Sequence, residues 1–193
     1  MEISRRVAAA CGIGGPVAFV GGWLLNGLRT DGYHPLSDAI SQLAREGAPT
    51  RTSMTACFVA FGVLVPVWAR TVARELDAPA LRPVVTVAGL ATLAVAAIPL
   101  ARDPGGAQDV FHGIAAGTGY VAMALTGLVA APALRRHGRT AAANASIGVA
   151  LISAGSLVAT LFTDGGGGFQ RLGLTVVDAW HVAVAGWVLT RRP

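Results

Sequence analysis

LGLTVVDAWHVAVAGWVLT, residues 172–190, is long enough and apolar enough to form a helix that crosses a lipid bilayer. Such a helix needs about 20 mostly apolar residues. Five similar stretches precede it, and Pro or Gly together with charged residues separates them. They are Val7–Leu28, Thr52–Ala69, Pro83–Leu100, Val110–Leu134 and Thr140–Phe162. The sequence therefore predicts an all-α polytopic membrane protein, a single bundle of six transmembrane helices over residues 1–193.

The composition of the chain agrees with a membrane protein. Of its 193 residues, 53% are hydrophobic and 13% are charged, and the mean hydropathy is +0.59. Soluble domains carry about 25% charged residues. The high hydrophobic content also argues against a disordered chain, although the sequence contains 25 Gly and 10 Pro.

All 15 basic residues are Arg, and their distribution predicts the orientation of the bundle. Ten fall on the side that holds both termini and five on the other side. Cytoplasmic segments of membrane proteins carry the excess of positive charge, so we predict that both termini are cytoplasmic. The net charge of +5 then reflects topology, which argues for membrane lipids and against nucleic acid as partners. The ten are Arg5, Arg6, Arg70, Arg74, Arg82, Arg135, Arg136, Arg139, Arg191 and Arg192, and the five are Arg29, Arg45, Arg51, Arg102 and Arg171.

Two ionisable residues lie inside the last predicted helix. Asp178 and His181 are three residues apart, which places them on one helix face. Counted from Arg191, His181 lies about 15 Å and Asp178 about 20 Å above the inner boundary, and Tyr120 reaches a similar depth. Ionisable groups inside a bilayer are costly and usually functional. Two interpretations stay open: an acid–base pair that acts on a ligand, or a self-satisfied polar network that serves packing.

A similar spacing of an acid and a histidine opens the fourth predicted helix. Asp109 and His112 are also three residues apart, and they lie at the outer mouth of the bundle. His112 is therefore a third candidate for acid–base chemistry. Asp109 has a plainer explanation as well, because an acid at a helix start caps free N–H groups and suits the helix dipole.

The outer loop between Arg29 and Arg51 is the longest in the chain. Ser37 or Asp38 is expected to cap a short helix, because the apolar residues that follow recur at helical spacing. We expect this segment to lie on the bundle as a lid or as an interfacial helix. Its candidate ligand-binding residues are Tyr33, His34, Asp38 and Ser41.

No cofactor is predicted, and zinc is kept as a lesser alternative. Three His with one open position is a catalytic zinc arrangement, and His34, His112 and His181 invite that hypothesis. The depths disagree, because His112 lies about 33 Å above the inner boundary and His181 about 15 Å. A haem held between His112 and His181 meets the same objection.

Three local patterns predict structure rather than chemistry. Gly113 and Gly117 form a small-xxx-small face that favours close helix packing. The run Gly165–Gly168 is typical of a flexible outer turn. Trp68 and Trp187 lie near predicted helix ends, where an indole suits the membrane interface.

At these residues the chain resembles a bacterial membrane-protein family, domain of unknown function 998 (DUF998), over nearly its whole length. The shared pattern includes an outer-loop stretch, an Asp-Pro segment shortly before a His, and a last helix that opens with Gln-Arg and continues to an acid and a Trp. In this chain these are Tyr33–Leu43 followed by Gly47-Ala48-Pro49, Asp103-Pro104 before His112, and Gln170-Arg171 before Asp178 and Trp180.

The resemblance implies six helices in a bacterial cytoplasmic membrane, and it implies no established reaction. It adds Asp103, Gln170 and Arg171 to the outer cluster. Arg171 then has three candidate partners, Asp164, Asp178 and an anionic ligand, and the alternative is that its side chain turns outward to water.

Three classes of function follow: an intramembrane enzyme, a binding or transport subunit, and a structural or accessory membrane protein. We expect a polar cavity that opens to the outer face and binds a lipid or small amphiphile, with catalysis by Asp178, His181 and His112 if the protein is an enzyme. Asp178 should form the floor of this cavity. The residues expected around its opening are Arg171, Asp103, Asp109, His112, Asp38 and His34.

Overall fold

The computed structural model describes residues 3–163 and 166–191. Within these residues the chain forms six α-helices and one short 3-10 helix, η1, and contains no strand. The elements are α1 (Arg5–Gly27), η1 (Ile40–Ala44), α2 (Arg51–Glu75), α3 (Leu81–Ala97), α4 (Ala107–Arg136), α5 (Thr140–Thr160) and α6 (Gly166–Thr190). The predicted all-α class is confirmed.

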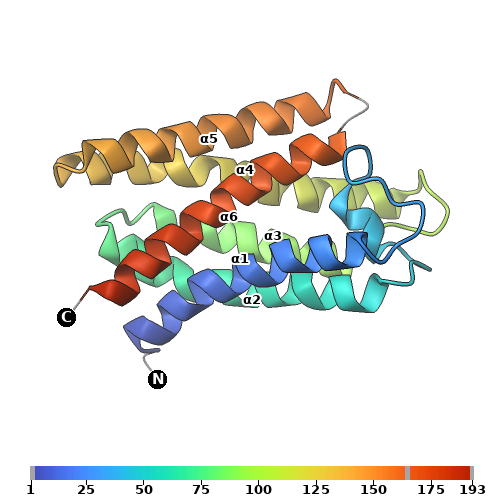
Figure 1. Ribbon diagram of the computed structural model, residues 1–193, viewed down its shortest axis with the longest axis horizontal. Helices are drawn as coiled ribbons and strands as arrows, with labels where there is room; N and C mark the ends of the chain where they lie inside the picture. Colours follow the sequence, from blue (N-terminus) through green and yellow to red (C-terminus); the bar gives the residue numbers. More distant parts are fainter. Residues whose placement is uncertain (1–2, 164–165, 192–193) are drawn as a thin grey trace.

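The helices run up and down beside one another (Figure 1). Each helix packs on the next in the chain, and α6 also packs on α1, so the six close into a ring. α6 makes further contacts with α4 and α2. Large apolar side chains such as those of Met54, Val65 and Val177 are fully buried between the helices.

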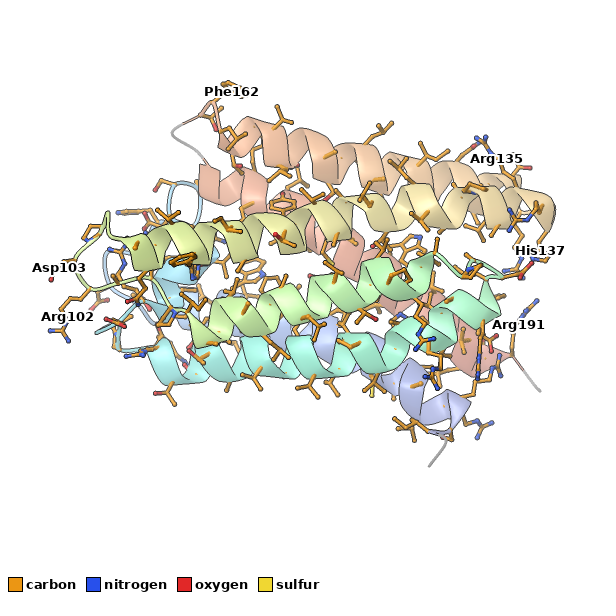
Figure 2. The ribbon with its side chains drawn as sticks, turned by 180° about the vertical axis from the view of Figure 1, so that it is seen from behind. Arg102, Asp103, Arg135, His137, Phe162 and Arg191 are labelled. Atoms are coloured by element: carbon orange, nitrogen blue, oxygen red, sulfur yellow. The ribbon has the colours of Figure 1, made fainter. Side chains whose placement is uncertain are left out.

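The two ends of the bundle differ in charge. We call the end at which α1 begins and α6 ends the basic end, and the opposite end, with η1 and residues 28–50, the lid end. Figure 2 shows Arg135, His137 and Arg191 at the basic end and Arg102 and Asp103 at the lid end. Nine described arginines belong to the basic end: Arg5, Arg6, Arg70, Arg74, Arg82, Arg135, Arg136, Arg139 and Arg191. Arg192 lies outside the described residues.

Five of the helices are long and apolar enough to cross a membrane by length and composition. The exception is α3, which has 17 residues and ends at Ala97 rather than at the predicted Leu100. Its end has a local cause, because a residue that precedes proline is pushed out of the helical region, and Ile98 precedes Pro99.

Two glycines permit close contacts of α4 with its neighbours. A Cβ on Gly127 would collide with the carbonyl oxygen of Ser146 in α5, and a Cβ on Gly173 would collide with the Tyr120 hydroxyl of α4. In contrast, a Cβ on Gly113 or Gly117 would meet no described atom within 4 Å. The predicted packing face of these two glycines is therefore wrong for this chain.

Two further local predictions are wrong. Gly166–Gly168 form the first residues of α6 instead of a turn, while Gly165 lies outside the described residues. Glycine suits this position because a Cβ on Gly167 would lie 2.8 Å from the carbonyl oxygen of Pro35, where the lid-end loop crosses the helix. Trp68 is fully buried, because α2 continues to Glu75 and carries the indole away from the helix end.

Candidate functional site

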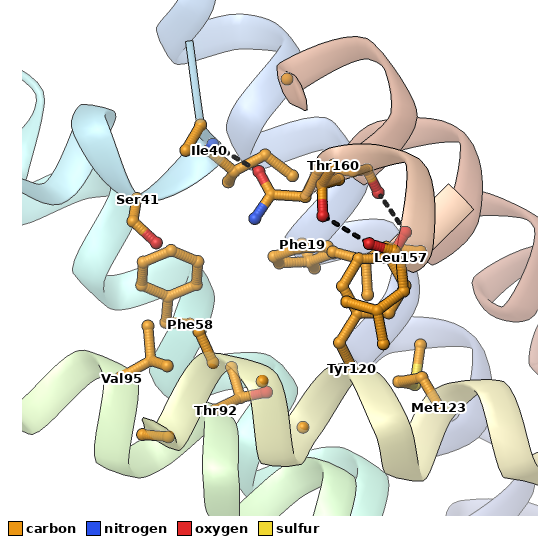
Figure 3. Close-up of a pocket in the computed structure, with 18 of the residues that line it drawn as sticks. Phe19, Ile40, Ser41, Phe58, Thr92, Val95, Tyr120, Met123, Leu157 and Thr160 are labelled. Atoms are coloured by element: carbon orange, nitrogen blue, oxygen red, sulfur yellow. Dashed lines mark hydrogen bonds between the residues drawn. The ribbon is translucent and has the colours of Figure 1, made fainter. Parts of the chain in front are cut away.

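A cavity of about 310 Å³ lies inside the lid end of the bundle (Figure 3). Four aromatic rings, from Phe19, Phe58, Phe61 and Tyr120, contribute to its wall together with apolar residues of α3, α4 and α5. Each of the six α-helices contributes at least one aromatic or polar residue to the wall, so only the closed ring brings these groups together. Besides the hydroxyl of Tyr120, the polar side chains of its lining are Ser37, Ser41, Thr92, Thr160 and Gln170.

The roof of the cavity is η1 with the residues before it, and the beginning of α6 holds it in place. The backbone N–H of Ile40 donates to Oε1 of Gln170 at 2.8 Å. The backbone N–H of Gly168 donates to the carbonyl oxygen of Leu36, also at 2.8 Å. Ile40 is buried, as are Leu43 and Ala44, so the expected lid packs on the bundle.

Arg171 makes the largest number of these roof contacts. Its Nη1 donates to the carbonyl oxygens of Pro35 at 2.5 Å, Asp38 at 2.8 Å and Gly167 at 2.8 Å. Its Nη2 donates to the hydroxyl of Tyr33. The guanidinium also lies 5.4 Å from the centre of the Tyr33 ring. Burial raises the pKa of Tyr33, and the charge of Arg171 opposes that rise. Arg171 is only 7% exposed, so this cation is part of the internal structure of the lid end.

The predicted cap of the lid helix is wrong. The N-cap of η1 is Ala39, and neither Ser37 nor Asp38 caps it. Oδ2 of Asp38 instead accepts from the backbone N–H of His34 at 2.7 Å and closes the preceding turn. His34 is exposed.

The loop between α3 and α4 and the beginning of α4 hold a second cluster of polar residues, apart from the cavity. The carboxylate of Asp109 accepts from the backbone N–H groups of Ala101 and Gly105, each at 2.8 Å, which supports its structural interpretation. Nδ1 of His112 lies 2.6 Å from the carbonyl oxygen of Ile98, and His112 is 4% exposed. Asp103 is exposed in this loop. The lining of the cavity includes none of Asp103, Asp109 and His112.

Asp178 and His181 are 1% and 0% exposed, so their expected burial is confirmed. The indole N–H of Trp68 donates to Nδ1 of His181 at 3.3 Å. Among the described residues, neither carboxylate oxygen of Asp178 has a hydrogen-bond partner, and neither does Nε2 of His181. Both residues lie below the cavity, and neither lines it.

The candidates therefore divide into three places instead of meeting at one opening. Of the predicted ligand-binding residues, Ser41, Tyr120 and Gln170 line the cavity. Arg171, Tyr33, Asp38 and Gly167 form the roof contacts. The predicted pair of Arg171 with Asp178 is wrong, because the guanidinium turns toward the loop, and Asp164 lies outside the described residues.

No three of the described His, Cys, Asp and Glu residues lie together in a group that could hold a metal ion. The three-His zinc arrangement is therefore not formed by His34, His112 and His181. Sequence reasoning also missed the aromatic wall. Phe58 and Phe61 are three residues apart on α2, a spacing that marks one helix face but does not reveal what that face meets.

A family model described as "Protein of unknown function (DUF998)" matches residues 13–187, nearly the whole chain. No curated protein and no solved structure matches the chain.

Proposed function

We propose, from the premise that the chain belongs to the DUF998 family of proteins of unknown function, that its lid-end cavity binds a lipid chain or a small amphiphile. The observation that carries this proposal is the cavity itself, about 310 Å³ in volume with an aromatic wall and few polar groups. Ligand pockets have volumes of roughly 300–1,000 Å³ and are mostly apolar with a few polar groups. This cavity is at the small end of that range, which favours one chain or a compact amphiphile over a whole two-chain lipid.

The surroundings of the cavity support a ligand that comes from a membrane. Five apolar helices are long enough to span a bilayer. The 17 residues of α3 cover about 26 Å, and Ile98, Pro99 and Leu100 extend this apolar segment by up to about 3.3 Å each. All six helices of this single domain therefore suffice to cross about 30 Å of hydrocarbon.

The distribution of arginines supports a cytoplasmic basic end. The lid end and its cavity then face the outside of a bacterial cytoplasmic membrane, in line with the resemblance noted above. In this orientation the roof formed by η1 separates the cavity from the outer aqueous phase. Membrane lipids are the natural partners of such a site.

Binding without catalysis is the function that the geometry favours. The three residues predicted for acid–base chemistry, Asp178, His181 and His112, are absent from the cavity lining. A ligand in the cavity would meet instead the hydroxyls of Ser41 and Tyr120, which suit hydrogen bonding more than proton transfer.

The test uses an octanol that carries a photoreactive diazirine, added to the full-length protein in nanodiscs of zwitterionic lipid. We expect light to attach the probe to the lining residues Met123 and Leu157, as mapped by peptide mass spectrometry. Ala116→Phe places a large ring in the lining and should abolish this labelling.

Ala154→Phe is the matched control, because Ala154 is exposed on α5 and should leave the labelling intact. Labelling that stays confined to exposed apolar residues in the wild type would contradict the proposal. So would equal labelling of Met123 in both Phe variants.

A further inference from the structure

One face of α6 connects the cavity with the buried acid. Leu174 lines the cavity, and Asp178 follows it by four residues on the same face. Four helical residues correspond to about 6 Å along the axis, so the carboxyl group lies one turn below the cavity floor. His181 continues this face by a further turn.

The carboxyl group of Asp178 has no hydrogen-bond partner among the described residues and is 1% exposed. A buried polar group without a partner is costly, and a buried charge is more costly still. Such a group in a membrane bundle is by default a candidate functional site.

His181 does not supply a positive charge to Asp178. The indole N–H of Trp68 can only donate, so Nδ1 of His181 must accept and carries no proton. The imidazole is therefore neutral, with its hydrogen on Nε2.

Other positive charges are also out of reach in the described part of the chain. Arg171 lies on the same face as Asp178, but its guanidinium binds the roof carbonyls two turns above. The helices α1, α2 and α4 carry their arginines near their ends, and α5 and η1 carry no charged residue. The titratable groups that these helices hold nearer the middle are Cys11, Cys57 and Tyr120, and none of them is a cation.

The aromatic wall of the cavity suits a cation. The faces of aromatic rings carry partial negative charge and attract ammonium groups. Phe19, Phe58 and Phe61 bring three such rings to the cavity above Asp178.

We propose that the cavity and Asp178 together bind an amphiphilic cation, with its apolar chain between the aromatic rings and its ammonium group at the cavity floor, facing the Asp178 carboxylate one helical turn below. This inference rests on the proposed function and names the chemical class of its ligand. The ammonium group compensates the charge of the carboxylate, which lowers the cost of burying this acid.

The experiment measures competition against labelling of Met123 by the photoreactive octanol. Octylammonium, 1-octanol and octanoate have the same chain length and differ in the charge of the end group. In the wild type we expect octylammonium to compete at a concentration roughly tenfold or more below that of 1-octanol. Octanoate should compete least well.

Asp178→Asn keeps the shape of the side chain and removes its charge. We expect the advantage of octylammonium over 1-octanol to fall to about twofold or less in this variant, while 1-octanol competes as before. Asp103→Asn is the matched control, because it removes an exposed acid at the same end of the bundle and should keep the full advantage.

Each result has one meaning. If octylammonium has no advantage in the wild type, or keeps its full advantage in Asp178→Asn, the cation site is overturned and the cavity stands. If Met123 is not labelled at all, the proposed function fails and this inference fails with it. Unchanged labelling of Asp178→Asn by the octanol probe shows that the variant is folded.

Discussion

Arg171 compensates its buried charge with backbone oxygens and aromatic rings, and no described carboxylate forms an ion pair with it. A guanidinium offers five donors in a fixed plane, whereas the ammonium of lysine is a compact point charge. One Nη group that donates to the carbonyls of Pro35, Asp38 and Gly167 therefore fixes the loop against α6 in a way that lysine does not reproduce.

We predict that Arg171→Lys loosens the roof of the cavity. Loss of two or more charged hydrogen bonds should lower the free energy of unfolding by about 2–3 kcal/mol, because the carbonyls are left without donors. Amide hydrogen exchange over residues 33–44 should become faster while exchange within α2 stays slow. Arg29→Lys, at an exposed position, is the control. Equal protection of residues 33–44 in both variants would rule out this role of Arg171.

At the scale of helices, the contact between α4 and α6 depends on the missing side chain of Gly173. A Cβ there would meet the hydroxyl of Tyr120, and it would lie 2.8 Å from Cβ of Ser156 in α5. The glycine thus lets the Tyr120 hydroxyl pass over α6 to the carbonyl oxygens of Phe169 and Gln170, at 3.3 and 3.4 Å.

We predict that Gly173→Ala destabilises the protein by about 1–3 kcal/mol, as overpacking of a core usually does. Addition of Tyr120→Phe should recover part of the loss, because it removes the atom nearest to the new methyl group. The thermal midpoint of each variant in nanodiscs gives the comparison. Gly113→Ala should have a neutral or slightly stabilising effect, since the added Cβ meets no described atom within 4 Å. If Tyr120→Phe lowers the thermal midpoint of the Gly173→Ala variant further, this account of the contact is wrong.

The helices could be predicted from the sequence because apolar length alone specifies a membrane-spanning segment. Their ends depend on finer chemistry, as the early end of α3 before Pro99 shows. The site was harder to predict. Helical spacing placed Asp178 and His181 on one buried face, but it carries no information about which neighbouring helix supplies a partner.

The hydrogen-bond partners of Arg171 could not be predicted from the sequence. Its charge suggested a carboxylate partner, yet its acceptors are backbone carbonyls, which every residue possesses and no sequence pattern marks. Trp68 was misplaced for a related reason. Its indole donates to His181, 113 residues further along the chain, and only the closed ring of helices creates that contact.

At the scale of the whole molecule, the closure of the ring holds the first and last helices together at the basic end. Arg5 donates to both carboxylate oxygens of Glu75, at 2.6 and 3.0 Å, and to the carbonyl oxygen of Arg191 at 3.2 Å. Arg139 and Arg191 both stack on the ring of Trp187, at 4.2 and 4.1 Å from its centre. This end of the molecule gathers cations that suit an anionic membrane surface.

We predict that the basic end faces the cytoplasm, and single cysteines test this in a background with Cys11→Ala and Cys57→Ala. A membrane-impermeant maleimide applied to intact cells should label Asp103→Cys at the lid end and should label His137→Cys only after the cells are broken. Positive charge near membrane helices is retained on the cytoplasmic side, which gives the expected direction. The opposite labelling pattern would reverse the orientation.

The roof of the cavity also sets an order of events during biosynthesis. Pro35 and Arg171 are 136 residues apart, and chains grow at about 5–20 residues per second, so Arg171 leaves the ribosome roughly 7–27 s after Pro35. Throughout that interval the nascent loop lacks its guanidinium donor, and the aromatic wall lacks α6. A chain whose synthesis stops before α6 therefore keeps a loop without its anchoring contacts and exposes its aromatic rings. Membrane chaperones and proteases that survey unfinished chains have that interval in which to act, and insertion of the last helix ends it.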